Sequence, residues 1–173
     1  RANVPSDDST PVLTDSKHWF LDLPDCTDQL KAWLDSHPEW RSNVRGIAYG
    51  WVQDLRARCI TRDTDWGIPI PVDDADAADK RIYVWFDAPI GYVTNTRQWG
   101  LDQGLGDDAW KCWWKDRGTR MIHFIGKDNV PFHAVIFPAM LMGQEGYITA
   151  DQVVGNEYLN IYNRRTGKSE KGS

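Results

Sequence analysis

Hydrophobic positions recur at helical spacing in two stretches of the chain. The first follows Thr27, a residue type that often caps a helix, and contains Leu30, Trp33 and Leu34. The second follows Asn43, and its apolar positions are Val44, Ile47, Ala48, Trp51, Val52 and Leu55. Intervals of three and four residues place side chains on one face of a helix. The pattern therefore predicts two amphipathic helices, with Trp33 and Trp51 facing a core.

Short apolar runs in other parts of the chain are typical of strands. They occupy residues 17–23, 59–61, 82–86, 121–125 and 152–154, and the last one continues in extended form through 158–161. A helix is predicted from Asp128, as its N-cap, to Gly143, as its C′ glycine, and a tryptophan-rich helix over 109–114. Strands that alternate with helices indicate an α/β fold with a mainly parallel sheet.

Composition and charge restrict the class of protein. Of the 173 residues, 41% are hydrophobic, which is enough to bury a core. Twenty basic and 25 acidic residues leave a net charge of −5, whereas a face that grips nucleic acid broadly is usually basic. A local basic patch is still compatible with this average. No apolar run reaches the roughly 18 residues of a membrane span, so no membrane partner is expected.

The cysteines and the first residues of the chain concern its cellular compartment and its completeness. Cys26, Cys59 and Cys112 are odd in number and widely spaced, which is typical of free thiols in a reducing cytoplasm. The start, Arg1–Pro5, has no Met and no signal-peptide pattern. We therefore expect a cytoplasmic piece of a longer chain.

A candidate ligand site lies at Gly126-Lys127-Asp128, between a predicted strand and a predicted helix. Ligands of open α/β sheets bind outside the carboxyl ends of the strands, and a glycine there lets a ligand approach the backbone. The same pattern also fits a purely structural helix cap. His133, which follows on the helix, is by itself equally compatible with a buried core histidine.

Two long motifs resemble a known family. Val84-Trp85-Phe86-Asp87-Ala88-Pro89-Ile90-Gly91-Tyr92 and His123-Phe124-Ile125-Gly126-Lys127-Asp128-Asn129-Val130-Pro131-Phe132-His133 are similar to the methionine-binding half of methionyl-tRNA synthetases, which are class I aminoacyl-tRNA synthetases. With its neighbouring segments the resemblance covers about residues 12–160. It implies that 1–58 is the C-terminal part of a connective insertion. It also implies that 59–173 is the second half of a Rossmann-like catalytic domain.

The resemblance also implies site residues. The methionine pocket would be formed by Trp85, Ala88, Pro89, Tyr92, Asn129, Phe132, His133 and Phe137. The ATP side would contain Gly126, Asp128, Tyr158 and Leu159. Arg62 would support the amino-acid site through a carboxylate from the missing half. An aromatic pocket suits methionine because a thioether is polarizable and packs well on aromatic edges.

The end of the chain resembles the family's lysine loop with differences. Lys168 and Lys171 occupy the two lysine positions, whose charges would stabilise the phosphates during adenylate formation. Glu170 stands where the family has a serine, and a carboxylate beside triphosphate is unfavourable. Three alternatives remain open: a different register, an altered or disordered tail, or a divergent relative.

Together these expectations describe part of a ligase that activates methionine with ATP and Mg²⁺ and transfers it to tRNA, mainly through parts absent here. Alone, the fragment should be poorly active. Val4-Pro5-Ser6-Asp7 stands where the family has a zinc-binding Cys-x-x-Cys, so no zinc site is expected in this segment. The alternatives are a repurposed synthetase-like module that binds methionine or a relative, and a tryptophan-rich surface that binds carbohydrate or peptide.

Overall fold

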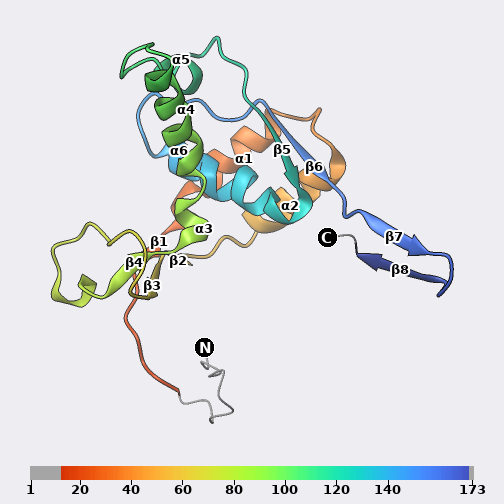
Figure 1. The fold of residues 1–173 in the computed structure, drawn as a ribbon, viewed down its shortest axis with the longest axis horizontal. Helices are drawn as coiled ribbons and strands as arrows, with labels where there is room; N and C mark the ends of the chain where they lie inside the picture. The colour runs from red at the N-terminus through yellow and green to blue at the C-terminus, as the bar shows by residue number, and fades with distance from the viewer. Residues whose placement is uncertain (1–12, 172–173) are drawn as a thin grey trace. The chain divides into compact units, whose positions relative to one another are not determined.

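The computed structural model describes residues 13–171 (Figure 1). The chain forms two compact units. Unit 1 combines the N-terminal part, up to Leu21, with Cys59–Tyr83. Unit 2 combines Asp22–Arg58 with the rest of the chain from Val84. The chain passes from one unit to the other between residues 58 and 59, and 22–58 belongs to the same unit as the C-terminal part. The assignment of 1–58 to a connective insertion remains a prediction.

Unit 1 is built around a small antiparallel sheet. Strand β3 (Thr61–Asp63) pairs with β4 (Lys80–Ile82), so that Arg62 lies opposite Arg81. The long acidic loop between these strands contains a 3₁₀ turn, Ala75–Ala77. Two short strands, β1 (Phe20–Leu21) and β2 (Arg58–Cys59), complete the strands of this region.

Unit 2 contains the helices of the described chain. They are α1 (Thr27–Asp35), α2 (Ser42–Val52), α3 (Val84–Asp87), α4 (Ile90–Asp102), α5 (Lys111–Trp114) and α6 (Phe137–Met142). The two predicted amphipathic helices are confirmed as α1 and α2. Their stripes are buried at Leu30, Trp33, Leu34, Val44, Ala48 and Val52. Trp51 is only half-buried, and the guanidinium of Arg58 lies 4.2 Å from the centre of its ring.

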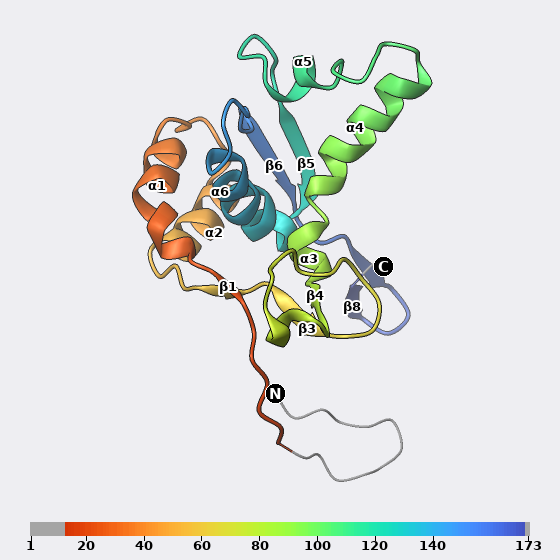
Figure 2. The ribbon, with the colours of Figure 1, turned by 90° about the vertical axis from the view of Figure 1, so that its left-hand side faces the viewer.

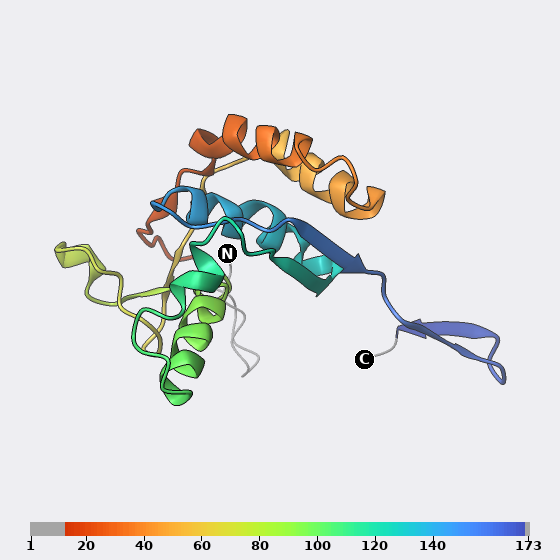
Figure 3. The same ribbon diagram turned by 90° about the horizontal axis from the view of Figure 1, so that it is seen from above.

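A parallel strand pair forms the centre of unit 2. Strand β5 (Ile122–Gly126) pairs with β6 (Gln152–Asn156), with His123 opposite Val153. Figures 2 and 3 show the two strands side by side, with the helical segment that connects them running alongside. Helix α2 also packs on β6, so closely that a Cβ on Gly155 would lie 2.9 Å from Val44 Cγ2.

The predicted mainly parallel sheet remains a prediction. Among residues 13–171, β5–β6 is a parallel pair, whereas β3–β4 and the pair of β7 (Asn160–Asn163) and β8 (Lys168–Lys171) are antiparallel. Parallel strands need a crossover connection, and residues 127–151 supply one only between β5 and β6. The coarser prediction of an α/β fold is confirmed.

The predicted strand over 82–86 is wrong. Strand β4 ends at Ile82, and the chain turns into α3, where the amide of Ala88 donates to the carbonyl of Val84. Residues 87–91 form the junction of two helices: Pro89 has helical φ and ψ and caps α4. Because a proline has no N–H to lose, it fits the start of a helix. The predicted strand over 17–23 is reduced to β1.

The predicted helix from Asp128 to Gly143 is irregular. It starts as a 3₁₀ turn, Lys127–Asn129, widens into a π turn, Phe132–Ile136, and becomes regular only in α6. The amide of Phe137 donates to the carbonyl of Phe132, five residues earlier. Pro138 lacks the N–H that a regular turn would use at that point. Gly143 does follow the last helical residue, but with a φ of −73°, so its freedom to adopt positive φ is not used.

Candidate functional site

A cavity of about 470 Å³ lies in unit 2 at the carboxyl end of β5. The helical segment after β5 forms one wall, and the junction of α3 with α4 forms the other. Its lining residues are Trp85, Ala88, Pro89, Gly91, Tyr92, Asn95, Phe124, Ile125, Gly126, Asn129, Phe132 and His133. The two motifs singled out in the sequence therefore meet around one cavity.

Most of the predicted pocket residues are brought together, with one exception. Seven of the eight predicted methionine-pocket residues line the cavity, and so does Gly126. Phe137 does not, because it is 1% exposed and packs in the core with Trp114 and Leu141. Its ring lies behind Tyr92, with 6.1 Å between the ring centres. Phe137 thus supports the pocket wall from the core side.

Tyr92 and His133 form a hydrogen-bonded pair at the cavity. His133 Nδ1 lies 2.9 Å from the carbonyl oxygen of Asn129, and Nε2 lies 2.9 Å from the Tyr92 hydroxyl. A carbonyl only accepts, so Nδ1 carries the proton. Burial lowers the pKa of His133, which keeps the ring neutral. Nε2 must therefore accept, and the Tyr92 O–H donates to it.

Other aromatic rings complete the walls. Trp85 and Phe132 pack with their ring centres 5.4 Å apart. His123, which precedes the cavity-lining part of β5, places its ring 5.2 Å from that of His133 and 6.0 Å from that of Tyr92. Burial and the neighbouring His133 lower the pKa of His123 to about 4. The site is therefore aromatic and uncharged near neutral pH.

The predicted ATP-side residues lie where β5 and β6 end. Asp128 follows Gly126, and Tyr158 follows β6; a hydrogen bond from the Tyr158 hydroxyl to the Asp128 carboxylate raises the pKa of Tyr158. No neighbouring atom lies within 4 Å of a Cβ built on Gly126, so the backbone is open to a ligand. Leu159 is exposed.

The three predicted catalytic residues lie outside this cavity. Arg62 belongs to unit 1, where its guanidinium stacks 3.7 Å from the centre of the Tyr83 ring and donates to the carbonyl of Thr61. It is therefore held within its own unit rather than solvated. Lys168 and Lys171 begin and end β8, so the predicted loop is a strand. Gly167, with a φ of +66°, makes the tight turn that allows this pairing.

Four lining residues were missed at the sequence level: Gly91, Asn95, Phe124 and Ile125. A signal existed for Asn95, because it lies three residues after Tyr92 on one helix face. Phe124 and Ile125 stand inside the quoted motif, in β5, but the strand pattern alone does not indicate which strand residues line a cavity.

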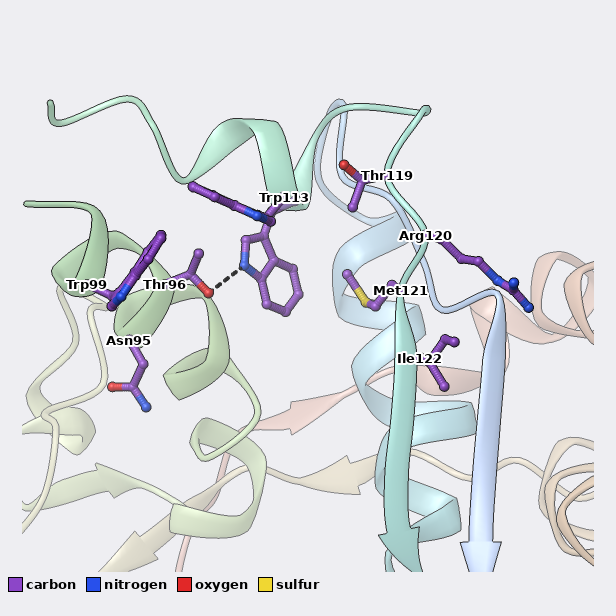
Figure 4. A pocket seen from close by; sticks show the side chains of 9 residues that line it. Asn95, Thr96, Trp99, Trp113, Thr119, Arg120, Met121 and Ile122 are labelled. Atoms are coloured by element: carbon purple, nitrogen blue, oxygen red, sulfur yellow. Dashed lines mark hydrogen bonds between the residues drawn. The ribbon is translucent and has the colours of Figure 1, made fainter. Parts of the chain in front are cut away.

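A second cavity, of about 520 Å³, lies further along α4 (Figure 4). Its walls are Asn95, Thr96, Trp99, Trp113, Trp114, Thr119, Arg120, Met121 and Ile122. The Trp114 Nε1–H donates to Thr96 Oγ1, the bond drawn in Figure 4. Three of the ten tryptophans therefore line one cavity, while Trp33 and Trp40 are core.

Residues 13–171 contain no group of three or more His, Cys, Asp or Glu side chains placed to hold a metal ion. The positions compared with the family's zinc ligands, Val4–Asp7, lie outside the described residues. None of the helices formed by 13–171 has the length and hydrophobicity that a membrane crossing requires.

The lowered pKa values of His123 and His133 predict a dependence of stability on pH. Both have a lowered pKa when folded, so between about pH 6.5 and about pH 4 the unfolded chain binds protons that folded His123 does not. The free energy of unfolding should be unaffected by these groups above pH 6.5 and should fall as the pH drops through this window. Urea unfolding at pH values above and below this window measures the change in the free energy of unfolding. His123→Phe keeps a ring and should flatten the dependence; an unchanged slope would contradict the assignment.

The chain is an α/β protein with an aromatic cavity at the carboxyl end of a parallel strand, which is where ligands of α/β sheets bind. The family model described as "tRNA synthetases class I (M)" matches residues 2–172. The chain belongs to this family of class I tRNA synthetases.

Similar proteins agree with this membership. The chain is 46% identical over 168 residues to a methionine–tRNA ligase of Salinibacter ruber, and 49% identical over 155 residues to one of Porphyromonas gingivalis. These matches include 94% and 88% of this chain but only 23% and 22% of those proteins. The chain thus spans less than a quarter of the length of these relatives.

Solved structures of Mycobacterium tuberculosis methionyl-tRNA synthetase are also similar. The apo form has a TM-score of 0.66 and 27% identity, over 91% of this chain and 30% of that one. The form bound by methionyl-adenylate has a TM-score of 0.66 and 26% identity, over 96% of this chain and 32% of that one.

Proposed function

We propose that this chain is the part of a methionine–tRNA ligase that binds methionine and one side of ATP. The observation that carries the proposal is the cavity in which Tyr92 and His133 are hydrogen-bonded among aromatic rings. Its neutral walls suit a thioether, whose contacts with aromatic rings are worth about 0.3–1.5 kcal/mol each. The methionyl-adenylate bound by the Mycobacterium tuberculosis relative supports the same ligand.

The proposed reaction joins the methionine carboxylate to the α-phosphate of ATP and releases pyrophosphate. Magnesium enters with ATP as part of the substrate. In this scheme the cavity holds the side chain, and Gly126 and Asp128 face the nucleotide. Lys168 and Lys171 stabilise charge on the departing phosphates, and Arg62 supports the amino-acid site. Transfer to tRNA then uses parts of the longer protein.

We also propose that β5 and β6 belong to a larger Rossmann-like sheet. A parallel sheet is normally covered on both faces. Here Ile122, on the face of β5 opposite His123, is exposed. A two-stranded sheet is marginal by itself, so further strands and helices of the longer chain would cover this face. The fragment alone should accordingly be poorly active, and the location would be the cytoplasm.

The proposed function is tested by calorimetric titration of the chain with methionine and with norleucine, which has a methylene in place of sulfur. Preference for methionine supports the pocket, and equal binding or none contradicts it. Activity is tested in a chimera, in which this chain replaces the matched segment of the Salinibacter ruber relative. ATP–pyrophosphate exchange is the measurement.

Tyr92 provides a specific prediction in the chimera. Tyr92→Ala removes a wall and the donor to His133, so the KM for methionine should rise by roughly tenfold or more, with little change in the KM for ATP. Tyr92→Phe keeps the ring and loses only the hydrogen bond, which should cost less. Equal KM values for methionine in all three proteins would rule out the pocket assignment.

The second candidate is a repurposed module that binds methionine or a related molecule without activating it. Glu170, between the two lysines in the sequence, favours it, because a carboxylate there would oppose a triphosphate. Methionine binding combined with a chimera that lacks exchange activity would select this candidate.

A further inference from the structure

Polar side chains from three segments meet where β5 and β6 end. Lys127, directly after β5, places Nζ 2.5 Å from Glu157 Oε2, directly after β6. The other carboxylate oxygen of Glu157 accepts a hydrogen bond from Asn43 Nδ2 at 3.1 Å. Asn43 comes from the first turn of α2. The carboxylate of Glu157 is therefore held from both sides.

Asn43 is itself fixed against the sheet. Its Nδ2 also donates to the carbonyl of Gly155 at 3.2 Å. The next residue, Val44, is fully buried and lies against Gly155, where a Cβ would come within 2.9 Å of it. Helix α2 thus cannot shift along β6 without loss of packing. Because Asn43 is fixed in this way, its side-chain amide can orient the carboxylate of Glu157.

The same two strand ends carry the proposed nucleotide residues. Asp128 follows Lys127, and Tyr158 follows Glu157, so two adjacent residues of one strand end pair with two adjacent residues of the other. The Tyr158 hydroxyl hydrogen-bonds to Asp128, and Lys127 Nζ lies 4.4 Å from the centre of the Tyr158 ring. The Lys127–Glu157 ion pair therefore lies beside the Asp128–Tyr158 hydrogen bond.

We infer that Glu157, held by Lys127 and Asn43, is a positioning residue that keeps Tyr158 against Asp128. This inference rests on the proposed function only for its consequence, namely that nucleotide binding uses this arrangement. An isolated exposed ion pair adds little to stability. The effect of the cluster is thus local, on the orientation of the strand ends, and global stability should change little when it is broken.

The test is a titration of the Tyr158 hydroxyl in the chain, monitored by NMR of ¹³C-labelled tyrosine. The signal of Tyr158 is assigned by its loss in Tyr158→Phe. In the parent, the hydrogen bond to Asp128 raises the pKa of Tyr158, and the charge of Lys127 opposes this rise. Lys127→Met removes that opposing charge, so the pKa of Tyr158 would rise if electrostatics acted alone. If Lys127 and Glu157 position Tyr158, its contact with Asp128 is lost and the pKa falls. The two explanations have opposite signs.

A lower pKa of Tyr158 in Lys127→Met, restored in the charge-exchanged variant Lys127→Glu/Glu157→Lys, supports the inference. A rise or no change overturns it. The control Asp107→Asn breaks the Arg97–Asp107 ion pair, which has the same 2.5 Å length, and should leave Tyr158 unchanged. In the chimera, Glu157→Gln should raise the KM for ATP by roughly tenfold and leave that for methionine unchanged. If the parent chimera fails to use ATP, the proposed function fails, while the titration still decides the inference.

Discussion

Phe137→Ala is expected to lower the free energy of unfolding of the chain by about 3–5 kcal/mol. The ring is 1% exposed and packs with Trp114 and Leu141 in one core cluster. Its removal leaves a cavity that neighbouring rings cannot fill, because Tyr92 is tied to His133 and Trp114 to Thr96. Urea unfolding followed by tryptophan fluorescence gives the change.

Phe124→Ala is the matched control for this prediction. The same side chain is removed, but Phe124 is 73% exposed, so the change should stay within about 0.5 kcal/mol. Phe137→Ala should also weaken methionine binding, since Tyr92 loses its support. Equal stability losses in the two variants would show that Phe137 is not a core residue.

Lys168→Ala and Lys171→Ala are each expected to slow ATP–pyrophosphate exchange in the chimera by about 100-fold to 1000-fold. A positive charge aimed at the phosphates helps most when their negative charge grows, so the rate should suffer more than methionine binding. Lys111→Ala is the control, because Lys111, the first residue of α5, is an exposed lysine that pairs with Asp108. Rates equal to the parent in both variants would remove the two lysines from the mechanism.

Glu170→Ser extends the same prediction. A serine removes a negative charge between the lysines in the sequence, so exchange should become faster. A slower rate would instead indicate that the carboxylate has acquired a role of its own. It would favour the repurposed module.

The sequence predicted the core helices because their signal is local. Leu30 and Leu34 lie one turn apart, and burial of such a stripe stabilises a helix whatever it packs against. The same holds for the strand that precedes Gly126. The two motifs of the cavity were found by resemblance, and the structure does place Trp85, Tyr92 and His133 around one space.

The wrong predictions concern segments in which an apolar pattern and a nearby proline favour different conformations. Val84-Trp85-Phe86 is apolar enough for a strand, but the helical junction at Pro89 decides its conformation. Phe137 follows His133 at helical spacing, but the π turn before Pro138 rotates it into the core. The spacing of apolar residues does not indicate either effect, since both depend on which backbone hydrogen bonds a proline removes.

By itself the sequence determined the elements with strong periodicity, the family and the residue types of the pocket. Only the tertiary structure decided which elements pair. It placed α2 against β6 through Gly155 and Val44, so that 22–58 and the C-terminal part lie in one compact unit. It also fixed the proton of His133 on Nδ1, through the carbonyl of Asn129. The reason is physical: such contacts join residues distant in the chain, and their geometry depends on packing that no local pattern encodes.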